Sequence, residues 1–155
     1  MSQKINQVNV QRRGHSYGGW LAAYYALENK VAGIILEDPA GLKEFIEDRT
    51  AENPQYIDRM IKNAVQINPN EDVLRKMLTA DNSESVLTQQ VLEEIDARTL
   101  IIWGADDRTV NIRYSKIFSK YMPNSRLVVI KGERHTPHYT NPGSVAEVML
   151  DFVRV

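Results

Sequence analysis

A serine between two glycines near the start of this 155-residue chain places the strongest constraint on its fold. Gly14, Ser16 and Gly18 form a G-x-S-x-G motif, which precedes a helical pattern. It follows a stretch of alternating apolar residues, Ile5–Gln11, which we predict to be the first strand. In this context the motif predicts a sharp turn from strand to helix that exposes the serine hydroxyl. Glycines suit positions 14 and 18 if backbone segments crowd together there. The alternative interpretation is a glycine-rich helix start with an incidental serine.

The predicted turn also bears on reactivity. A serine hydroxyl is a weak nucleophile until a base removes its proton. The helix after the turn directs its first N–H groups and the positive end of its dipole toward any negative charge that develops near Ser16. The backbone N–H of Tyr17 is therefore the expected hydrogen-bond donor to an oxyanion.

Two later apolar runs each end close to residues that could complete such a site. Thr99–Trp103 is followed by Asp106 and Asp107, and Arg126–Ile130 is followed by His135. Near-continuous apolar runs are typical of parallel strands covered on both faces. An acid after one buried strand and a histidine after the next give the order serine, aspartate, histidine along the chain.

These motifs resemble those of the α/β-hydrolase superfamily, in particular the C-terminal portion of its cap-bearing members, such as esterases and proline iminopeptidases. The resemblance covers nearly the whole chain, from Val8 to Val155. It is carried by three segments: Gly14–Gly19, Trp103–Asp107 and Gly132–His135.

The resemblance implies a role for each residue of a catalytic triad. Ser16 is similar to the nucleophile of the family and His135 to its general base. Asp107 matches the acid that orients the histidine, since the family pattern after this strand reads Gly-x-x-Asp. Asp106 is the alternative acid, in which case Asp107 caps the following helix.

Other polar residues near these motifs have simpler interpretations. Asp38 lies where some relatives keep an alternative acid, and we interpret it as a turn residue before Pro39. His15 is expected to pack or form a hydrogen bond inside the serine motif, and His138 to lie in a loop. Glu133 and the two histidines near it could suggest a metal, but their spacing matches no zinc motif and the chain has no cysteine.

Composition excludes several classes of partner. The net charge of −1 gives no electrostatic reason to expect nucleic acid or an anionic membrane surface. The absence of cysteine excludes disulfides and thiolate metal sites. No apolar run approaches the ~20 residues of a transmembrane helix, and the N-terminus lacks an apolar signal region. We expect a cytoplasmic protein that needs neither cofactor nor metal.

The remaining pattern predicts an α/β fold with four parallel strands, flanking helices and one helical insertion. We expect a single, truncated domain over 1–155, with an insertion at about 42–97 where the family carries its cap. Helices are also predicted from the serine turn to Asn29 and over 111–122. The last helix, which Asn141 can cap, has an apolar stripe predicted to be buried: Val145, Val148, Met149, Phe152 and Val153.

The resemblance also implies that part of the fold is missing. Full-length relatives usually have eight strands, four of which precede the strand that carries the serine, and that part supplies a second oxyanion N–H. Its absence predicts an unpaired edge at Ile5–Val10 and uncovered apolar sheet. Exposed edges recruit partners, so we expect a symmetric homodimer through this strand. Completion by another chain and a shortened gene are the alternatives.

Two functions are consistent with this sequence. The first is a serine hydrolase that acts on a small-molecule ester or amide through an acyl-enzyme, with Ser16, His135, Asp107 and the Tyr17 N–H as its machinery. The second is a catalytically incomplete remnant that keeps these residues but acts as a binding protein. The intact residues favour the enzyme, and the missing oxyanion donor favours the remnant.

Overall fold

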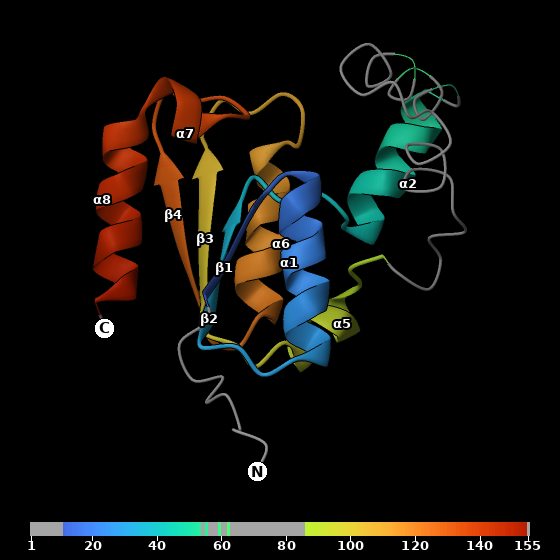
Figure 1. Ribbon diagram of the computed structural model, residues 1–155. Helices are drawn as coiled ribbons and strands as arrows, with labels where there is room; N and C mark the ends of the chain where they lie inside the picture. Colours follow the sequence, from blue (N-terminus) through green and yellow to red (C-terminus); the bar gives the residue numbers. More distant parts are fainter. Residues whose placement is uncertain (1–10, 54, 56–58, 60–61, 63–85, 155) are drawn as a thin grey trace. The chain divides into compact units, whose positions relative to one another are not determined.

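The computed structural model describes residues 11–53, 55, 59, 62 and 86–154. Its centre is a sheet of four parallel strands, which lie in the order in which they follow one another along the chain (Figure 1). The strands are β1 (Gln11–His15), β2 (Gly33–Glu37), β3 (Thr99–Gly104) and β4 (Ser125–Ile130). The predicted α/β class with four parallel strands is confirmed.

Helices pack on both faces of this sheet. Figure 1 shows α8 on one face and α1 with α6 on the other. The helices of this unit are α1 (Tyr17–Glu28), α5 (Gln89–Glu94), the 3-10 turn η2 (Ile112–Tyr114), α6 (Ser115–Tyr121), α7 (Pro137–Thr140) and α8 (Pro142–Val153). The helix predicted over 111–122 is thus divided into η2 and α6. Within the described ranges, no helix is both long and apolar enough to cross a membrane.

The chain divides into two compact units. Residues 1–40 and 87–155 form the unit with the sheet, and residues 41–86 form the second. The second unit contains α2 (Lys43–Glu52), in which the Thr50 hydroxyl donates a hydrogen bond to the Ile46 carbonyl at 2.8 Å. The predicted insertion at 42–97 covers this unit and extends into α5. That the insertion acts as a cap, and that the chain is a single domain, stay predictions.

The first strand continues beyond the residue where the sequence pattern places its end. β1 pairs with β2 from Gln11 opposite Gly33 to His15 opposite Glu37, so the prediction of a strand that ends at Gln11 is wrong. The two arginines at positions 12 and 13 interrupt the apolar alternation, and the extended conformation here is set by pairing with β2 instead. The rest of the predicted strand, Ile5–Val10, lies outside the described residues.

The strands also differ in burial. Every residue of β2 and β3 is buried, and for β3 the apolar run Thr99–Trp103 predicts this. For β4 that prediction is wrong, because Val129 is 39% exposed. Among the described strands, β4 pairs with β3 alone and forms an edge of the sheet, where cover is less complete.

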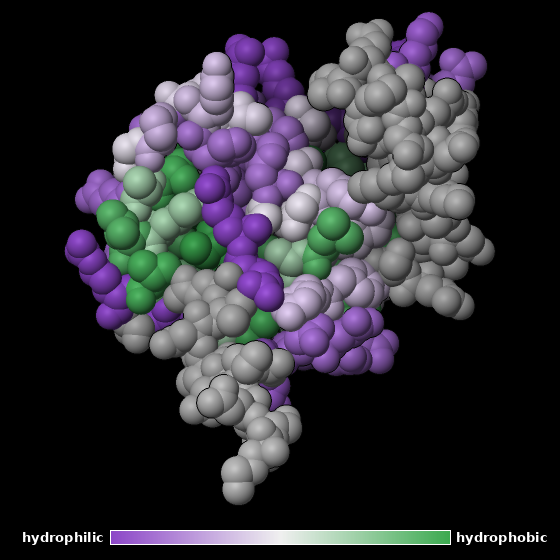
Figure 2. Space-filling view, in the orientation of Figure 1, coloured by the Kyte–Doolittle hydropathy of each residue, from purple (hydrophilic) through white to green (hydrophobic). Residues whose placement is uncertain are grey.

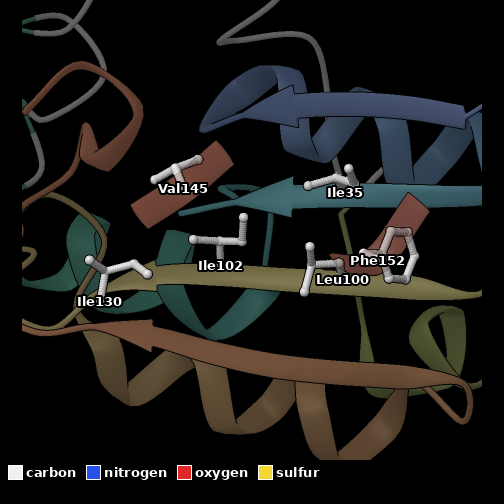
Figure 3. Close-up of a cluster of buried hydrophobic side chains, with 6 residues drawn as sticks. All are labelled: Ile35, Leu100, Ile102, Ile130, Val145 and Phe152. Atoms are coloured by element: carbon white, nitrogen blue, oxygen red, sulfur yellow. The ribbon is translucent and has the colours of Figure 1, made fainter. Parts of the chain in front are cut away.

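The core on one face of the sheet lies between β2, β3, β4 and α8 (Figure 3). Its buried side chains are Ile35, Leu100, Ile102, Ile130, Val145 and Phe152. Val148 and Met149 pack against it, which confirms most of the predicted apolar stripe of α8. The last member of the stripe, Val153, is 42% exposed because it lies at the end of the helix, so its predicted burial is wrong. Figure 2 shows apolar residues in green on the surface in the region of α8, where Leu150 and Val153 are exposed.

Candidate active site

Ser16 lies at the turn between β1 and α1 in a backbone conformation that few residues other than glycine adopt. Its φ is 53° and its ψ is −118°. The Ser16 N–H donates to the Glu37 carbonyl at 2.9 Å, and the Ser16 carbonyl accepts from the Gly19 and Ala40 N–H groups at 3.0 Å each. These bonds from three segments hold the strained turn in place. The predicted sharp strand-to-helix turn is present.

Close backbone contact explains one of the two motif glycines. A Cβ atom on Gly14 would lie 1.9 Å from the Gly18 carbonyl oxygen, so no other residue fits there. A Cβ on Gly18 would meet no atom of the described residues within 4 Å, so the predicted crowding at Gly18 is wrong. The neighbouring Gly19 is the second crowded position, because its Cβ would lie 2.9 Å from the Pro39 Cβ.

Three side chains that the sequence singled out lie in one hydrogen-bonded row. His135 Nε2 lies 3.0 Å from Ser16 Oγ, and His135 Nδ1 lies 2.8 Å from Asp107 Oδ2. Because an ionised carboxylate can only accept, Nδ1 carries the proton, and Nε2 is left to accept from the serine hydroxyl. The imidazole of His135 is thereby aligned to remove a proton from Ser16.

Asp107 is held as an anion in a buried position. Its side chain is 0% exposed, and its Oδ1 accepts hydrogen bonds from Thr109 and Val110 N–H at 2.7 and 3.0 Å. Burial alone would raise the pKa of Asp107, but hydrogen bonds from His135 and these two N–H groups lower it below its usual value. Asp106 is exposed, and its backbone N–H, rather than its side chain, contacts the segment before His135.

The segment that carries His135 crosses the end of β3. Asp106 N–H donates to the Glu133 carbonyl at 2.8 Å, and Ala105 N–H donates to the Ile130 carbonyl at 3.0 Å. A Cβ on Gly104 would lie 2.0 Å from the Arg134 carbonyl oxygen, so this crossing requires glycine at the end of β3. The ends of β3 and β4 therefore bring the acid and the histidine to the same edge of the sheet.

Tyr17 begins α1 directly after the serine. The first N–H groups of a helix have no partner within the helix and are available to a ligand. The Tyr17 N–H is one of them, at the end of α1 where the dipole is positive. Its assignment as an oxyanion donor stays a prediction.

Asp38 is not the simple turn residue that the sequence suggested. It is fully buried, has a φ of 42°, and accepts a hydrogen bond from the Gly104 N–H through Oδ1 at 2.9 Å. Its Oδ2 is buried without a hydrogen-bond partner among the described residues. Burial, together with the nearby charge of Asp107, raises the pKa of Asp38 to about 9. Asp38 is therefore a neutral carboxylic acid behind the row of side chains.

Among the residues that the structure describes, one group of three side chains has the composition of a metal site. One ligand atom each of Asp38, Asp107 and His135 lie within 4.8 Å of one another. The last two already bond to each other, so we assign no metal to them. The set considered from sequence does not gather either, because Glu133 accepts a hydrogen bond from Thr140 and His138 Nδ1 lies 2.9 Å from Glu37.

Sequence reasoning missed Glu37. This residue closes β2, is fully buried, and forms an ion pair with Arg13 Nη2 at 2.7 Å. The sequence signal that could have identified it is a charged residue at the end of an otherwise apolar run, because a buried carboxylate normally has a charged or hydrogen-bonding partner. His15 does form a hydrogen bond beside the serine motif, as expected, with Nε2 2.5 Å from the His135 carbonyl.

Comparison with known proteins identifies the fold through structure alone. No model of a protein family matches this chain, and no curated protein matches it either. These two comparisons, with family models and with curated proteins, therefore do not assign the chain to a family.

Solved structures share its architecture. A CIB-like hydrolase from Thermoplasma acidophilum has a TM-score of 0.64 and 20% identity, over 96% of this chain and 52% of that one. An α/β-hydrolase enzyme from the metagenome of lagoon sediments at Mar Chica, Morocco, has a TM-score of 0.72 and 18% identity, over 96% and 62%. A bromoperoxidase from Bacillus anthracis has a TM-score of 0.67 and 21% identity, over 99% and 70%. The chain spans 52% to 62% of the first two relatives, and it has the α/β-hydrolase fold.

Proposed function

We propose that this chain is a serine hydrolase that cleaves an ester or amide of a small molecule through an acyl-enzyme. The observation that carries the proposal is the row from Ser16 Oγ to His135 Nε2 at 3.0 Å and from His135 Nδ1 to Asp107 at 2.8 Å. A row of this kind activates a serine hydroxyl, because the base takes its proton and the acid stabilises the imidazolium that forms. The strained φ of 53° at Ser16 supports it, since strain of this kind clusters at active sites.

In the proposed reaction, Ser16 Oγ attacks the carbonyl carbon while His135 Nε2 takes its proton. The carbonyl oxygen becomes an oxyanion that accepts a hydrogen bond from the Tyr17 N–H. His135 then gives the proton to the leaving alcohol or amine, and an ester with Ser16 remains. Water, deprotonated by the same imidazole, hydrolyses that ester and restores the serine. The reaction consumes one water and uses no other co-reactant.

Covalent labelling tests the nucleophile directly. A fluorophosphonate should attach to Ser16 and to nothing else, and Ser16→Ala should abolish both this label and p-nitrophenyl ester hydrolysis. Mass spectrometry of the labelled peptide identifies the site. A folded protein that never labels would contradict the proposal and favour the binding-protein alternative.

Two adjacent aspartates provide a matched test of the acid. Asp107→Asn should lower kcat for a p-nitrophenyl ester by about 10⁴-fold, because the amide favours the wrong tautomer of the histidine. Asp106→Asn changes the exposed neighbour in the same way and should leave kcat within about twofold. Equal losses in the two variants would contradict the assignment of Asp107.

A further inference from the structure

Glu37 is a buried carboxylate that connects two segments of the candidate site. Its side chain is 0% exposed and accepts three hydrogen bonds: from Arg13 Nη2 at 2.7 Å, from the His138 backbone N–H at 2.8 Å and from His138 Nδ1 at 2.9 Å. Burial alone would raise the pKa of Glu37, but the hydrogen bonds from Arg13 and His138 outweigh it and lower that pKa. Glu37 is therefore an anion whose two oxygens are both in use.

The partners of Glu37 flank the two groups of the proposed proton transfer. Arg13 lies three residues before Ser16, on β1, and His138 lies three residues after His135, in α7. The backbone carbonyl of Glu37 also accepts from the Ser16 N–H at 2.9 Å. One residue of β2 thus contacts the nucleophile turn through its backbone and the base-carrying segment through its side chain.

His15 fills the space between these segments. Its ring centroid lies 4.8 Å from the rings of both His135 and His138, so all three histidines of the chain form one cluster. His15 Nε2 lies 2.5 Å from the His135 carbonyl, which can only accept, so this nitrogen carries the proton. The bond ties the backbone of the base to the residue directly before the nucleophile.

The base-carrying segment has little regular structure of its own to fix it. α7 has only four residues, and its N-cap Thr136 forms no capping hydrogen bond through its side chain. The bonds to Glu37 and the bond to His15 therefore add to the backbone hydrogen bonds between this segment and the end of β3 in positioning it. A misplacement of about 1 Å between reacting groups costs about 100-fold in rate.

We propose that Glu37 is a positioning residue, which fixes the His135 imidazole against Ser16 by joining Arg13 to His138. This inference rests on the proposed function, in which these two groups exchange a proton. Glu37 itself touches neither the substrate nor the reacting atoms.

The test compares Glu37→Gln with a matched ion-pair control. Glutamine keeps the size and one acceptor for His138, but its amide N–H₂ faces the guanidinium of Arg13, donor against donor. The rate of Ser16 phosphonylation should fall about 10- to 100-fold. Arg126→Gln removes an ion pair of 2.6 Å with Asp151 on the surface of β4 and α8, and it should leave the rate unchanged.

A milder variant guards against a folding defect. His138→Ala removes one donor from Glu37 while the ion pair with Arg13 and the His138 backbone bond remain. The phosphonylation rate should fall about 3- to 10-fold, since one of three bonds is lost. Thermal unfolding of each variant shows that the measured protein is folded.

A signal that needs no catalysis separates this inference from the proposed function. The proton on His135 Nδ1, bonded to Asp107, should give a downfield proton NMR resonance that broadens or shifts in Glu37→Gln and stays in Arg126→Gln. A wild-type protein that shows the resonance but never labels would contradict the proposed hydrolase alone. Variants at 37 and 138 that keep both the resonance and the labelling rate of the wild type would overturn the role of Glu37.

Discussion

At the scale of single residues, the candidate site depends on two residues whose backbone conformation is unfavourable for a side chain. Ser16 and Asp38 both have positive φ, at 53° and 42°, which costs energy for any residue with a Cβ. Their neighbours maintain these conformations through backbone hydrogen bonds and close contacts. Three substitutions, at Gly14, Gly18 and Asp38, test this description.

The motif glycines should respond to alanine in opposite ways. Gly14→Ala should lower the free energy of unfolding by about 3 kcal/mol or more, because its Cβ would lie 1.9 Å from the Gly18 carbonyl oxygen. Gly18→Ala should raise it by about 0.5 to 1 kcal/mol, since alanine is favoured over glycine in a helix and meets no described atom. Urea unfolding measures both, and similar losses would show that the turn differs from this description.

Asp38→Asn should stabilise the protein in a manner that depends on pH. The pKa of Asp38 is about 9 in the folded chain and near its ordinary value of 3.8 when unfolded. Between these values the folded state binds the extra proton, so wild-type stability should fall as pH rises from about 4 to 9. Asparagine carries no such proton and tolerates positive φ.

Thermal unfolding from pH 5 to pH 9 measures this effect. The stability gain of Asp38→Asn should grow with pH by up to ~1.4 kcal/mol per pH unit, because only the wild-type carboxyl binds a proton on folding. A gain that is constant over this range would mean that Asp38 does not change its charge on folding.

At the scale of elements, the sequence predicts best where one pattern alone decides the structure. β3 follows from an uninterrupted apolar run, and Asn141 with Pro142 predicts the start of α8. β1 could not be placed from its own residues, because Arg12 and Arg13 are extended through pairing with β2 rather than through local preference. The burial of β4 was also predicted wrongly, because the exposure of Val129 depends on which strands lie beside β4 and not on its own residues.

The packing of α8 on the sheet gives a prediction at this scale. Phe152→Ala should lower the free energy of unfolding by about 3 to 5 kcal/mol, because the ring is buried against Ile35 and Leu100 in the core. Val153→Ala, one residue further along the same helix, should cost less than about 0.5 kcal/mol because that side chain is exposed. Urea unfolding of the two variants checks this, and equal costs would contradict the described orientation of α8.

At the scale of the whole molecule, the grouping of site residues was easier to predict than their support. Ser16 could be chosen from its glycine motif, and Asp107 and His135 because each follows a recognisable strand in the expected order, although their catalytic roles stay predictions. Glu37 could not, since its importance depends on Arg13 and His138, which are distant from it in the sequence. Contacts between residues of three separate segments produce no recognisable pattern in the sequence around any one of them.

We retain the proposal of a homodimer through the first strand. Among the described strands, β1 pairs only with β2, so no described strand occupies its other edge. Light scattering should give twice the chain mass, and Val8→Pro should weaken association about tenfold or more, because proline removes an inter-strand hydrogen bond. Gln3→Pro is the control outside the predicted strand. A wild-type chain that stays monomeric as its concentration is raised would end this proposal.

The row of side chains also reports on how the chain folds. Ser16 and His135 are 119 residues apart in the sequence, and they meet only when β1, β2, β3 and β4 have all assembled. Contacts this distant along the chain form slowly, after the cost of closing the long loop has been met. Reactivity of Ser16 should therefore appear last during refolding, after helical circular dichroism has recovered. The time at which Ser16 becomes reactive toward the labelling reagent would then report when the tertiary structure is complete.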